Sequence, residues 1–536
     1  MLSLAMGATT VFAADKADYK VVPLPQSVAL QNGDAYVLTA ATKVCYPKQN
    51  EEMARNAKFL ADYVSDVTGI ALTTTTDKVK GAAIRLVIDK KIAGDEAYRL
   101  VVDKKNGITL SASTAKGIFY GIQTLRKALP VEKTTQVEMP AVVVNDSPTF
   151  SYRGMMLDCS RHFFPMWFVK QYIDLLAMHN MNVFHWHLSD DQGWRIEIKK
   201  YPRLTTVGSV RANTTIGHNT ELNDSTPYGG YYTQDQAREI VEYARQRYIT
   251  VIPEIDMPGH MKAALAAYPE LGCTGGPYEV GTRWGIYADV FCVGNEKVYQ
   301  FCEDVWSELM QIFPSTYIHI GGDETPTTRW ADCPKCKKVM ADNGLNIKNL
   351  QGYFTNRIEK FLNANGRRMI GWDEILGGKI NQSATIMSWR DMKQGIDAAY
   401  KGHDVIFSPT SHMYFDYCQS QKNYQYEPTR CGGDLSVEKV YSLKVCADTV
   451  SADVRKHIIG VQANLWTEHV PNAQVAEYQV LPRMAALADV NWTYGEKDFE
   501  GFKARVDRML KLYDLYHLTY AKHMWPERML SPYADN

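Results

Sequence analysis

The sequence predicts an α/β protein whose main part is a (β/α)8 TIM barrel. A small α/β domain precedes the barrel, and a C-terminal helix packs on it. The chain has 536 residues, too many for one ordinary domain. From residue 151 onward, apolar β-branched runs alternate with amphipathic helical stretches, and runs that are apolar throughout belong to parallel strands covered on both faces. Eight such units in about 330 residues favour a closed barrel over the alternative, a doubly wound open sheet.

Residues 19–150 are expected to form the small N-terminal α/β domain. Two strands, Ala97–Val102 and Gly107–Ala112, flank a Lys-Lys-Asn-Gly turn. A helix is predicted over Ala115–Leu129, where apolar residues recur at helical spacing. This region contains no recognisable catalytic constellation.

Residues 151–495 are expected to form the barrel. The candidate strands are Gly154–Asp158, Asn182–Leu188, Thr250–Ile255, Tyr317–Gly321, Met369–Trp372, Thr385–Trp389, Val405–Ser408 and Gly460–Trp466. Helices between them include Trp167–Met178, Gln234–Arg247 and Lys297–Phe313. The segment 496–536 follows, with apolar residues at helical spacing from Phe499 to Leu510, and it predicts the C-terminal helix.

The first residues indicate export. Met1–Ala14 is apolar and ends in small residues, as do the hydrophobic region and cleavage site of a signal peptide, so residues 1–18 are interpreted as a signal-peptide remnant. A periplasmic, cell-surface or extracellular location is expected. No later stretch reaches about 18 apolar residues, so no membrane span is expected.

Composition points away from nucleic acid. The chain carries 59 basic and 60 acidic residues, a near balance that argues against a basic nucleic-acid or membrane surface. It is rich in Tyr (32) and Trp (11), which suits a neutral sugar ligand, although a large aromatic core explains the same excess. No oligomeric state follows from the sequence.

The ten cysteines are too sparse for a disulfide scaffold. Cys333 and Cys336 form the one Cys-x-x-C pair, and a structural zinc site would need a second pair. Cys418, Cys431 and Cys446 do not have that spacing. We therefore interpret Cys333 and Cys336 as a loop staple or free thiols, with zinc ligation as the lesser alternative.

Functional side chains of such barrels project from the carboxyl ends of the strands. The residues there are Asp158–His162, His187–Asp191, Glu254–His260, Gly321–Glu324, Trp372–Glu374, Trp389 with Arg390, Tyr414–Asp416 and Trp466–Glu468. Nearly every strand end carries an acid, a His, an Arg or a Trp. Carboxylates transfer protons and bind hydroxyls, and indoles stack on sugar faces, so the pattern predicts a carbohydrate site.

Asp323 and Glu324 stand out among these strand ends. Two glycines precede them, so the backbone can turn tightly and present both carboxyls. A carboxyl held near another carboxylate and near indoles has a raised pKa, as a general acid needs near neutral pH. An isolated Asp-Glu pair would be a solvated acidic turn, but this context favours catalysis.

Residues 151 to about 500 resemble the catalytic barrel of the glycoside hydrolase family 20 β-N-acetylhexosaminidases of bacterial type. The resemblance rests on four segments in family order: Leu157-Asp-Cys-Ser-Arg161-His162-Phe163, Phe184-His-Trp-His-Leu-Ser-Asp190-Asp191-Gln192-Gly-Trp194, Glu254-Ile-Asp-Met-Pro-Gly-His260 and His319-Ile-Gly-Gly-Asp323-Glu324. The small preceding domain also resembles the one that these enzymes carry.

The resemblance implies substrate-assisted catalysis with retention of configuration, an exception to the usual two-carboxylate scheme. Glu324 would protonate the leaving oxygen and later activate water. The 2-acetamido oxygen of the substrate would attack the anomeric carbon and form an oxazolinium intermediate. Asp323 would accept a hydrogen bond from the acetamido N–H, and Tyr414 would donate one to its oxygen.

The family pattern also implies supporting roles. Arg161 would hold the 3- and 4-hydroxyls, with a structural ion pair as the alternative, and Asp416 and Glu468 would bind the 4- and 6-hydroxyl side. Asp190 and His260 match a pair that tunes Glu324 through hydrogen bonds. The three indoles expected to wall the acetamido and sugar face are Trp372, Trp389 and Trp466.

The expected substrate is a glycan with a terminal β-linked N-acetylhexosamine, removed one sugar at a time. No cofactor and no catalytic metal are expected. His185 and His187 share one side of a strand and could bind a metal with His260 or His319, but the family that the chain resembles needs none. His162, His319 and Asp191 are expected to support the site and not to act on the substrate. The alternatives are a disaccharide-releasing lacto-N-biosidase-like enzyme, a non-catalytic sugar-binding barrel and a metal-dependent hydrolase. Both Glu324 and Tyr414 are present, which opposes the non-catalytic alternative.

Overall fold

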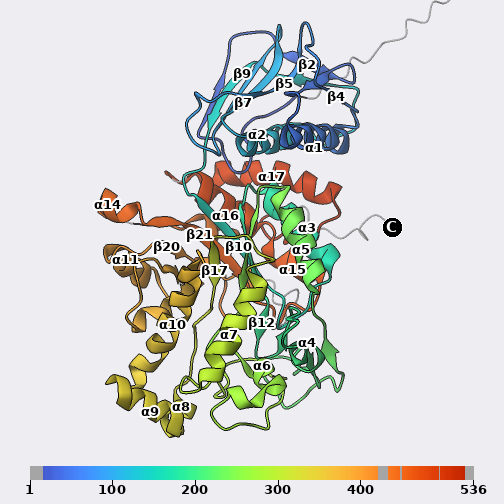
Figure 1. Cartoon of the computed structure of the whole chain (residues 1–536). Coiled ribbons are helices and arrows are strands. Elements are labelled where there is room, and N and C mark those ends of the chain that lie inside the picture. The colour runs from blue at the N-terminus through green and yellow to red at the C-terminus, as the bar shows by residue number, and fades with distance from the viewer. Residues whose placement is uncertain (1–15, 421–431, 447–448, 494, 526–536) are drawn as a thin grey trace, which may run out of the picture. The chain divides into compact units, whose positions relative to one another are not determined.

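A computed structural model of the chain describes residues 16–420, 432–446, 449–493 and 495–525 (Figure 1). The chain divides into two compact units. One contains the residues up to Pro148 together with Glu500–His517, and the other contains Thr149–Phe499 and the residues from Leu518. Most of the predicted signal-peptide remnant lies outside the described residues. None of the described helices combines the length and apolarity needed to cross a membrane.

The first unit is built on a seven-stranded mixed sheet. Its strands, in spatial order, are β1 (Ser27–Leu30), β9 (Val142–Asp146), β6 (Tyr98–Asp103), β7 (Gly107–Ala112), β5 (Ala83–Ile88), β3 (Lys43–Cys45) and β4 (Thr73–Thr75). A separate pair joins β2 (Tyr36–Thr39) to β8 (Gln136–Met139). The predicted hairpin is confirmed as β6 and β7, which pair antiparallel from Tyr98↔Ala112 to Asp103↔Gly107.

Two helices, α1 (Glu51–Thr68) and α2 (Ala115–Ala128), lie together on this sheet (Figure 1). Asn50 caps the start of α1 and Gly69, in a left-handed conformation, ends it. Almost all residues of α2 are buried. The predicted helix is confirmed within one residue of its end.

The C-terminal helix is confirmed as α17 (Phe499–Leu515), and residues 500–517 cluster with the first unit. Arg508 forms an ion pair with Asp18 at 2.7 Å, and the Tyr516 hydroxyl donates to Asp66 at 3.1 Å. Its packing on the barrel stays a prediction. Helical periodicity shows that one face is apolar, but it does not say which surface that face covers.

The second unit contains a closed barrel of eight parallel strands, as predicted. In order around the barrel they are β10 (Tyr152–Asp158), β11 (Val183–His187), β16 (Thr250–Glu254), β17 (Tyr317–His319), β18 (Arg368–Trp372), β19 (Thr385–Ser388), β20 (Val405–Phe407) and β21 (Ile458–Leu465). The barrel closes where β10 pairs with β21, from Tyr152↔Gly460 to Leu157↔Leu465. The alternative of an open sheet is thereby excluded.

Helices surround the barrel strands (Figure 1). They are α3 (Met166–Met178), α4 (Arg203–Thr206), α5 (Gln234–Arg245), α6 (Lys262–Ala267), α7 (Glu296–Leu309), α8 (Thr328–Asp332), α9 (Pro334–Asn343), α10 (Leu350–Ala364), α11 (Met392–Tyr400), α12 (Thr410–Met413), α13 (Val437–Tyr441), α14 (Ala452–Arg455), α15 (Ala473–Val480) and α16 (Arg483–Trp492). A capping box of Thr233 and Gln236 starts α5.

The interior of the barrel is filled by side chains from the strands. One buried cluster consists of Tyr152, Val183, Ile252, Ile370, Trp372, Met387 and Ile406. Two short antiparallel strand pairs lie in the connection between β11 and α5: β12 (Ser189–Asp190) pairs with β13 (Gly193–Trp194), and β14 (Val210–Arg211) pairs with β15 (Tyr228–Gly229). Because the eight strands are parallel, all their carboxyl ends open on one face, where the predicted site residues lie.

Candidate active site

The turn that follows β17 carries Asp323 and Glu324. Gly321 and Gly322 both have positive φ, 67° and 97°. A Cβ at Gly321 would lie 1.9 Å from Asp256 Oδ1, so only glycine fits there. The Gly322 N–H donates to the same oxygen at 2.9 Å. The turn is therefore built around the Asp256 carboxylate, which explains the two adjacent glycines.

Glu324 also has positive φ, 43°, which is uncommon for a residue with a side chain. Residues held in such sparsely populated conformations concentrate at functional sites. The Glu324 side chain is 37% exposed, whereas the adjacent Asp323 side chain is 12% exposed. The two carboxyls therefore meet different surroundings, and Glu324 is the one open to an incoming molecule.

Asp323 is a buried carboxyl in a negative environment. Burial, together with the charges of Glu254 and Glu324, raises its pKa, and the charge of His260 opposes that shift. Its Oδ1 atom has no hydrogen-bond partner within the described part of the chain. The same is true of one carboxylate oxygen on each of Asp416 and Glu468. Unpaired buried acceptors are costly, so these three oxygens are suited to bind donors of a ligand.

His260 connects two pairs of carboxylates. Its Nδ1 lies 3.1 Å from Asp190 Oδ1 and 3.0 Å from Asp191 Oδ2, and its Nε2 lies 3.7 Å from Asp323 Oδ2 and 3.6 Å from Glu324 Oε2. Burial alone would lower the pKa of His260, but the charge of Asp190 and the hydrogen bonds that Nδ1 donates to Asp190 and Asp191 raise it well above its ordinary value. His260 is therefore a cation beside both candidate catalytic carboxylates.

A buried network supports the site from inside the barrel. Glu254, at the end of β16, accepts hydrogen bonds from His187 Nδ1 at 2.5 Å and from the Trp372 indole at 3.0 Å. Its oxygens also lie 2.9 Å from His185 Nε2 and 3.0 Å from His319 Nδ1. Burial opposes the charge of Glu254, but these histidines hold its pKa well below the ordinary value. His185, His187 and His319 thus surround one carboxylate.

Arg161 is the basic group of the site. Its guanidinium lies 2.9 Å from Asp190 and 3.3 Å from Asp158, and 4.0 Å from Glu468 Oε1. Asp416 is buried and the Glu468 side chain is 16% exposed. Burial raises the pKa of each carboxyl, and the charge of Glu468 adds to the shift of Asp416. The structural ion pair considered for Arg161 exists, and the same guanidinium also faces the predicted hydroxyl-binding acids.

Aromatic side chains complete the group. Trp466 lies under the Arg161 guanidinium, 5.0 Å from the ring centroid, and 5.9 Å from the Trp372 ring. Trp389 stacks on Tyr414 with centroids 6.0 Å apart. Burial and the charges of Asp416 and Asp323 raise the pKa of Tyr414 well above its ordinary value, so its phenol is a donor at neutral pH. Trp372 itself is 1% exposed, and its indole N–H donates a hydrogen bond to Glu254.

The structure therefore brings together all the site residues that the sequence predicted, through the contacts and charge interactions described above. His162 and Asp191, which are expected to support the site, are both held by hydrogen bonds. The His162 ring bonds the Thr467 carbonyl, and Asp191 bonds His260 and the Lys262 N–H. The functional roles of the individual residues stay predictions.

Three acidic residues were not assigned from the sequence. They are Glu254, Asp256 and Glu374, and all stand in strand-end strings that the sequence analysis had already marked. Glu374 accepts from the Trp389 indole at 3.0 Å, and burial together with the charge of Asp323 raises its pKa to about 7. Their position at the strand ends marks these acids as candidates. The sequence alone does not show which other side chain each of them contacts.

The chain resembles known proteins over most of its length. Residues 150–494 match the family described as glycosyl hydrolase family 20, catalytic domain, and residues 18–147 match its domain 2. A β-hexosaminidase of Porphyromonas gingivalis is 42% identical over 511 residues, which is 93% of this chain and 64% of that protein. The chain thus spans slightly less than two thirds of this relative. A β-hexosaminidase of Vibrio furnissii is 36% identical, covering 89% of this chain and 77% of the relative.

Solved structures give the same result. A family 20 exo-β-N-acetylglucosaminidase of Vibrio harveyi, in complex with N-acetylglucosamine, is 31% identical with a TM-score of 0.83, over 97% of this chain and 81% of that chain. The N-acetyl-β-hexosaminidase of Streptomyces plicatus in complex with Thio-NAglucal is 31% identical with a TM-score of 0.82, over 94% of this chain and 96% of that chain.

Proposed function

The chain belongs to glycosyl hydrolase family 20, and from this premise we propose that it is an exo-acting, retaining β-N-acetylhexosaminidase. It removes terminal N-acetylhexosamines from the non-reducing ends of glycans by substrate-assisted catalysis. One observation carries the proposal: Asp323 and Glu324 lie side by side at the end of β17, differently exposed and both within 3.7 Å of the His260 ring. The names of the relatives, all β-hexosaminidases or N-acetylglucosaminidases, support it.

Glu324 is the proton donor. It is the more exposed of the two carboxyls, so it can meet the glycosidic oxygen, whose departure needs a proton. After the leaving group departs, the same carboxylate takes a proton from water, which attacks the anomeric carbon. His260, held by Asp190, is a positioning residue: its contact at 3.6 Å orients the Glu324 side chain.

Asp323 and Tyr414 act on the 2-acetamido group. The free Oδ1 of Asp323 accepts the acetamido N–H, and the Tyr414 hydroxyl donates to the acetamido oxygen as it attacks the anomeric carbon. The bond to the leaving oxygen breaks as the new C–O bond forms, giving a cyclic oxazolinium ion whose charge Asp323 stabilises. The amide nucleophile belongs to the substrate and is already in place, so proximity lowers the barrier by several kcal/mol.

Arg161, Asp416 and Glu468 bind the terminal sugar by its hydroxyls. Each of these charged groups is largely buried, and the two acids each have an oxygen free to accept a hydroxyl proton. A further sugar on one of these hydroxyls would remove a donor from a buried carboxylate, at about 1–3 kcal/mol or more. This arrangement favours removal of one terminal sugar at a time over release of a disaccharide.

Export is also part of the proposal, and it rests on the apolar segment Met1–Ala14. Cell fractionation with N-terminal sequencing of the mature protein tests it. A mature N-terminus at Met1 in the cytoplasmic fraction would contradict it.

The activity is tested by hydrolysis of a chromogenic β-N-acetylglucosaminide and of the matching β-glucoside. The enzyme should cleave the first and cleave the second poorly, because only the first carries the acetamido nucleophile. The same assay is repeated with a chelator, which would abolish the catalytic activity of a metal-dependent hydrolase. Equal rates on the two sugars would refute substrate assistance.

A further inference from the structure

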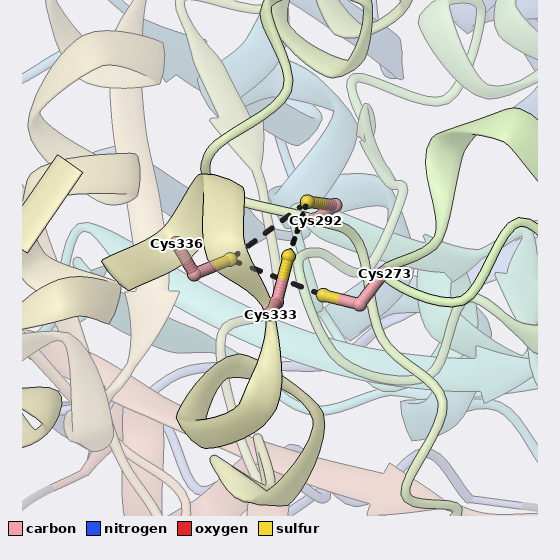
Figure 2. A group of neighbouring side chains, drawn as sticks. All are labelled: Cys273, Cys292, Cys333 and Cys336. Atoms are coloured by element: carbon pink, nitrogen blue, oxygen red, sulfur yellow. Dashed lines mark hydrogen bonds between the residues drawn. The ribbon is translucent and has the colours of Figure 1, made fainter. Parts of the chain in front are cut away.

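Outside the active site, four cysteine side chains of the second unit converge on one point (Figure 2). They are Cys273 and Cys292, from the segment between α6 and α7, and Cys333 and Cys336, at the start of α9. Cys292, Cys333 and Cys336 are buried, and Cys273 is half-buried. None of these residues takes part in the proposed reaction.

The spacing of the four sulfurs fits a metal better than disulfides. Cys292 Sγ lies 3.6 Å from Cys333 Sγ and 3.7 Å from Cys336 Sγ, and Cys273 Sγ lies 3.9 Å from Cys336 Sγ. All four sulfurs lie within 4.8 Å of one another. In a tetrahedral site with Zn–S bonds of about 2.3 Å, adjacent sulfurs are about 3.8 Å apart, whereas a disulfide joins sulfurs about 2.0 Å apart. Cys292 is nearly equidistant from two sulfurs, so no exclusive pairs are formed.

We propose that these four cysteines bind one structural Zn²⁺ as thiolates. Binding releases one proton from each thiol and leaves a complex with two net negative charges. All four positions of the tetrahedron are filled by protein sulfur, so none is open to water or substrate, as in structural zinc sites. The ligand order is one widely spaced pair followed by a Cys-x-x-C pair.

The surroundings favour thiolates at this point. Cys336 lies in the first turn of the ten-residue helix α9, whose N-terminus attracts negative charge. Exposed Lys335, Lys337 and Lys338 flank it and add positive charge. The Gly294 N–H also bonds the Cys336 sulfur. A Cβ at Gly294 would lie 2.2 Å from the Lys335 carbonyl carbon, so glycine is required for this approach of the two segments.

The proposed ion would join two βα segments of the barrel. One segment follows β16 and His260, and the other follows β17 and Glu324. Beside the sulfurs, the Trp330 indole donates to the Phe291 carbonyl at 2.9 Å, and Arg329 pairs with Asp289 at 2.7 Å. The metal would therefore stabilise the loops behind the candidate catalytic carboxylates without contacting substrate. This inference does not depend on the proposed function.

From the sequence, zinc ligation is the lesser alternative, because Cys333 and Cys336 have no second Cys-x-x-C pair to complete the site. The partners are Cys273 and Cys292, whose separation along the chain gives no local signal. The interpretation of Cys333 and Cys336 as a loop staple or free thiols therefore misses their two neighbours. No disulfide is formed among the described cysteines.

The test is the metal content and thiol state of the full chain, purified without chelator or added reductant. Elemental analysis should find about one zinc per chain, and native mass spectrometry should find the mass of the chain plus zinc with all thiols reduced. Removal of zinc should lower Tm by at least about 5 °C, since binding free energy at such sites is folding free energy. Cobalt replacing zinc should give the absorption bands of a tetrahedral tetrathiolate.

Two variants separate a metal from a disulfide. Cys273→His keeps a Cys3His ligand set and should retain zinc, whereas Cys273→Ser should lose most of it. Cys302→Ala, which removes a buried thiol outside the cluster, is the matched control and should retain zinc. A zinc-free protein with two disulfides among these cysteines would overturn the proposal, as would iron in place of zinc or unchanged zinc content in Cys273→Ser.

Discussion

Replacing His260 by Gln should shift the acidic limb of the pH–activity profile to higher pH. In the structure, the charge of His260 opposes the burial and the negative neighbours that raise the pKa of Asp323. Without that cation, Asp323 keeps the factors that favour its neutral form, so its pKa rises further. The proposed mechanism needs the Asp323 carboxylate, and a higher pKa therefore removes activity at a higher pH.

The distance gives the magnitude. His260 Nε2 and Asp323 Oδ2 are 3.7 Å apart. Two unit charges at that distance attract by about 4 kcal/mol at an effective dielectric constant of about 20, a ceiling of about 3 pKa units. Relaxation and water entry reduce this value, and shifts of about 1–3 units are usual for a close opposite charge. The limb should therefore move by about 1–3 pH units.

The assay is kcat/KM against pH on a chromogenic β-N-acetylglucosaminide. His403→Gln is the matched control, because His403 is also a buried histidine of the barrel unit but bonds only the Ala384 carbonyl among its described contacts. Its acidic limb should coincide with that of the wild type. An unshifted limb in a folded His260→Gln protein would refute the assignment of this charge to Asp323.

Four further outcomes are expected. Glu324→Gln should lower kcat on a poor leaving group by about 10²–10⁴-fold, and less on an acidic leaving group, because the variant lacks the proton donor; near-normal turnover of the poor leaving group would remove Glu324 from this role. Asp323→Asn should lower kcat more than it raises KM in steady-state kinetics, since its hydrogen bond strengthens as the amide attacks. Tyr414→Phe should show the same split, and a pure KM effect in either variant would contradict the assignment. Glu468→Gln should chiefly raise KM, and an unchanged KM would separate Glu468 from the terminal sugar.

The barrel could be predicted from the sequence because its strands are apolar throughout and its helices have a helical period of apolar residues. Each of the eight predicted strands overlaps a strand of the structure, with differences of one or two residues at most ends. The site was accessible for a related reason. Once the strand ends are placed, a parallel barrel brings them to one face, and the residues at those ends follow.

The features that could not be predicted from the sequence depend on contacts between segments that are far apart in the chain. Glu254 was marked only by position, and its three histidine partners come from β11 and β17. The surface covered by α17 and the meeting of Cys292 with Cys336 have the same origin. Local periodicity reports which face of an element is apolar, but it does not report the partner of that face or of a side chain.

The central claim is removal of one terminal sugar with retention of configuration. It is tested most directly by digesting a chitooligosaccharide labelled at its reducing end and following the first minutes by mass spectrometry and proton NMR. The proposed mechanism predicts β-configured N-acetylglucosamine as the first sugar released, together with a labelled chain shortened by one unit. Early disaccharide, or an α-anomer formed first, would contradict it.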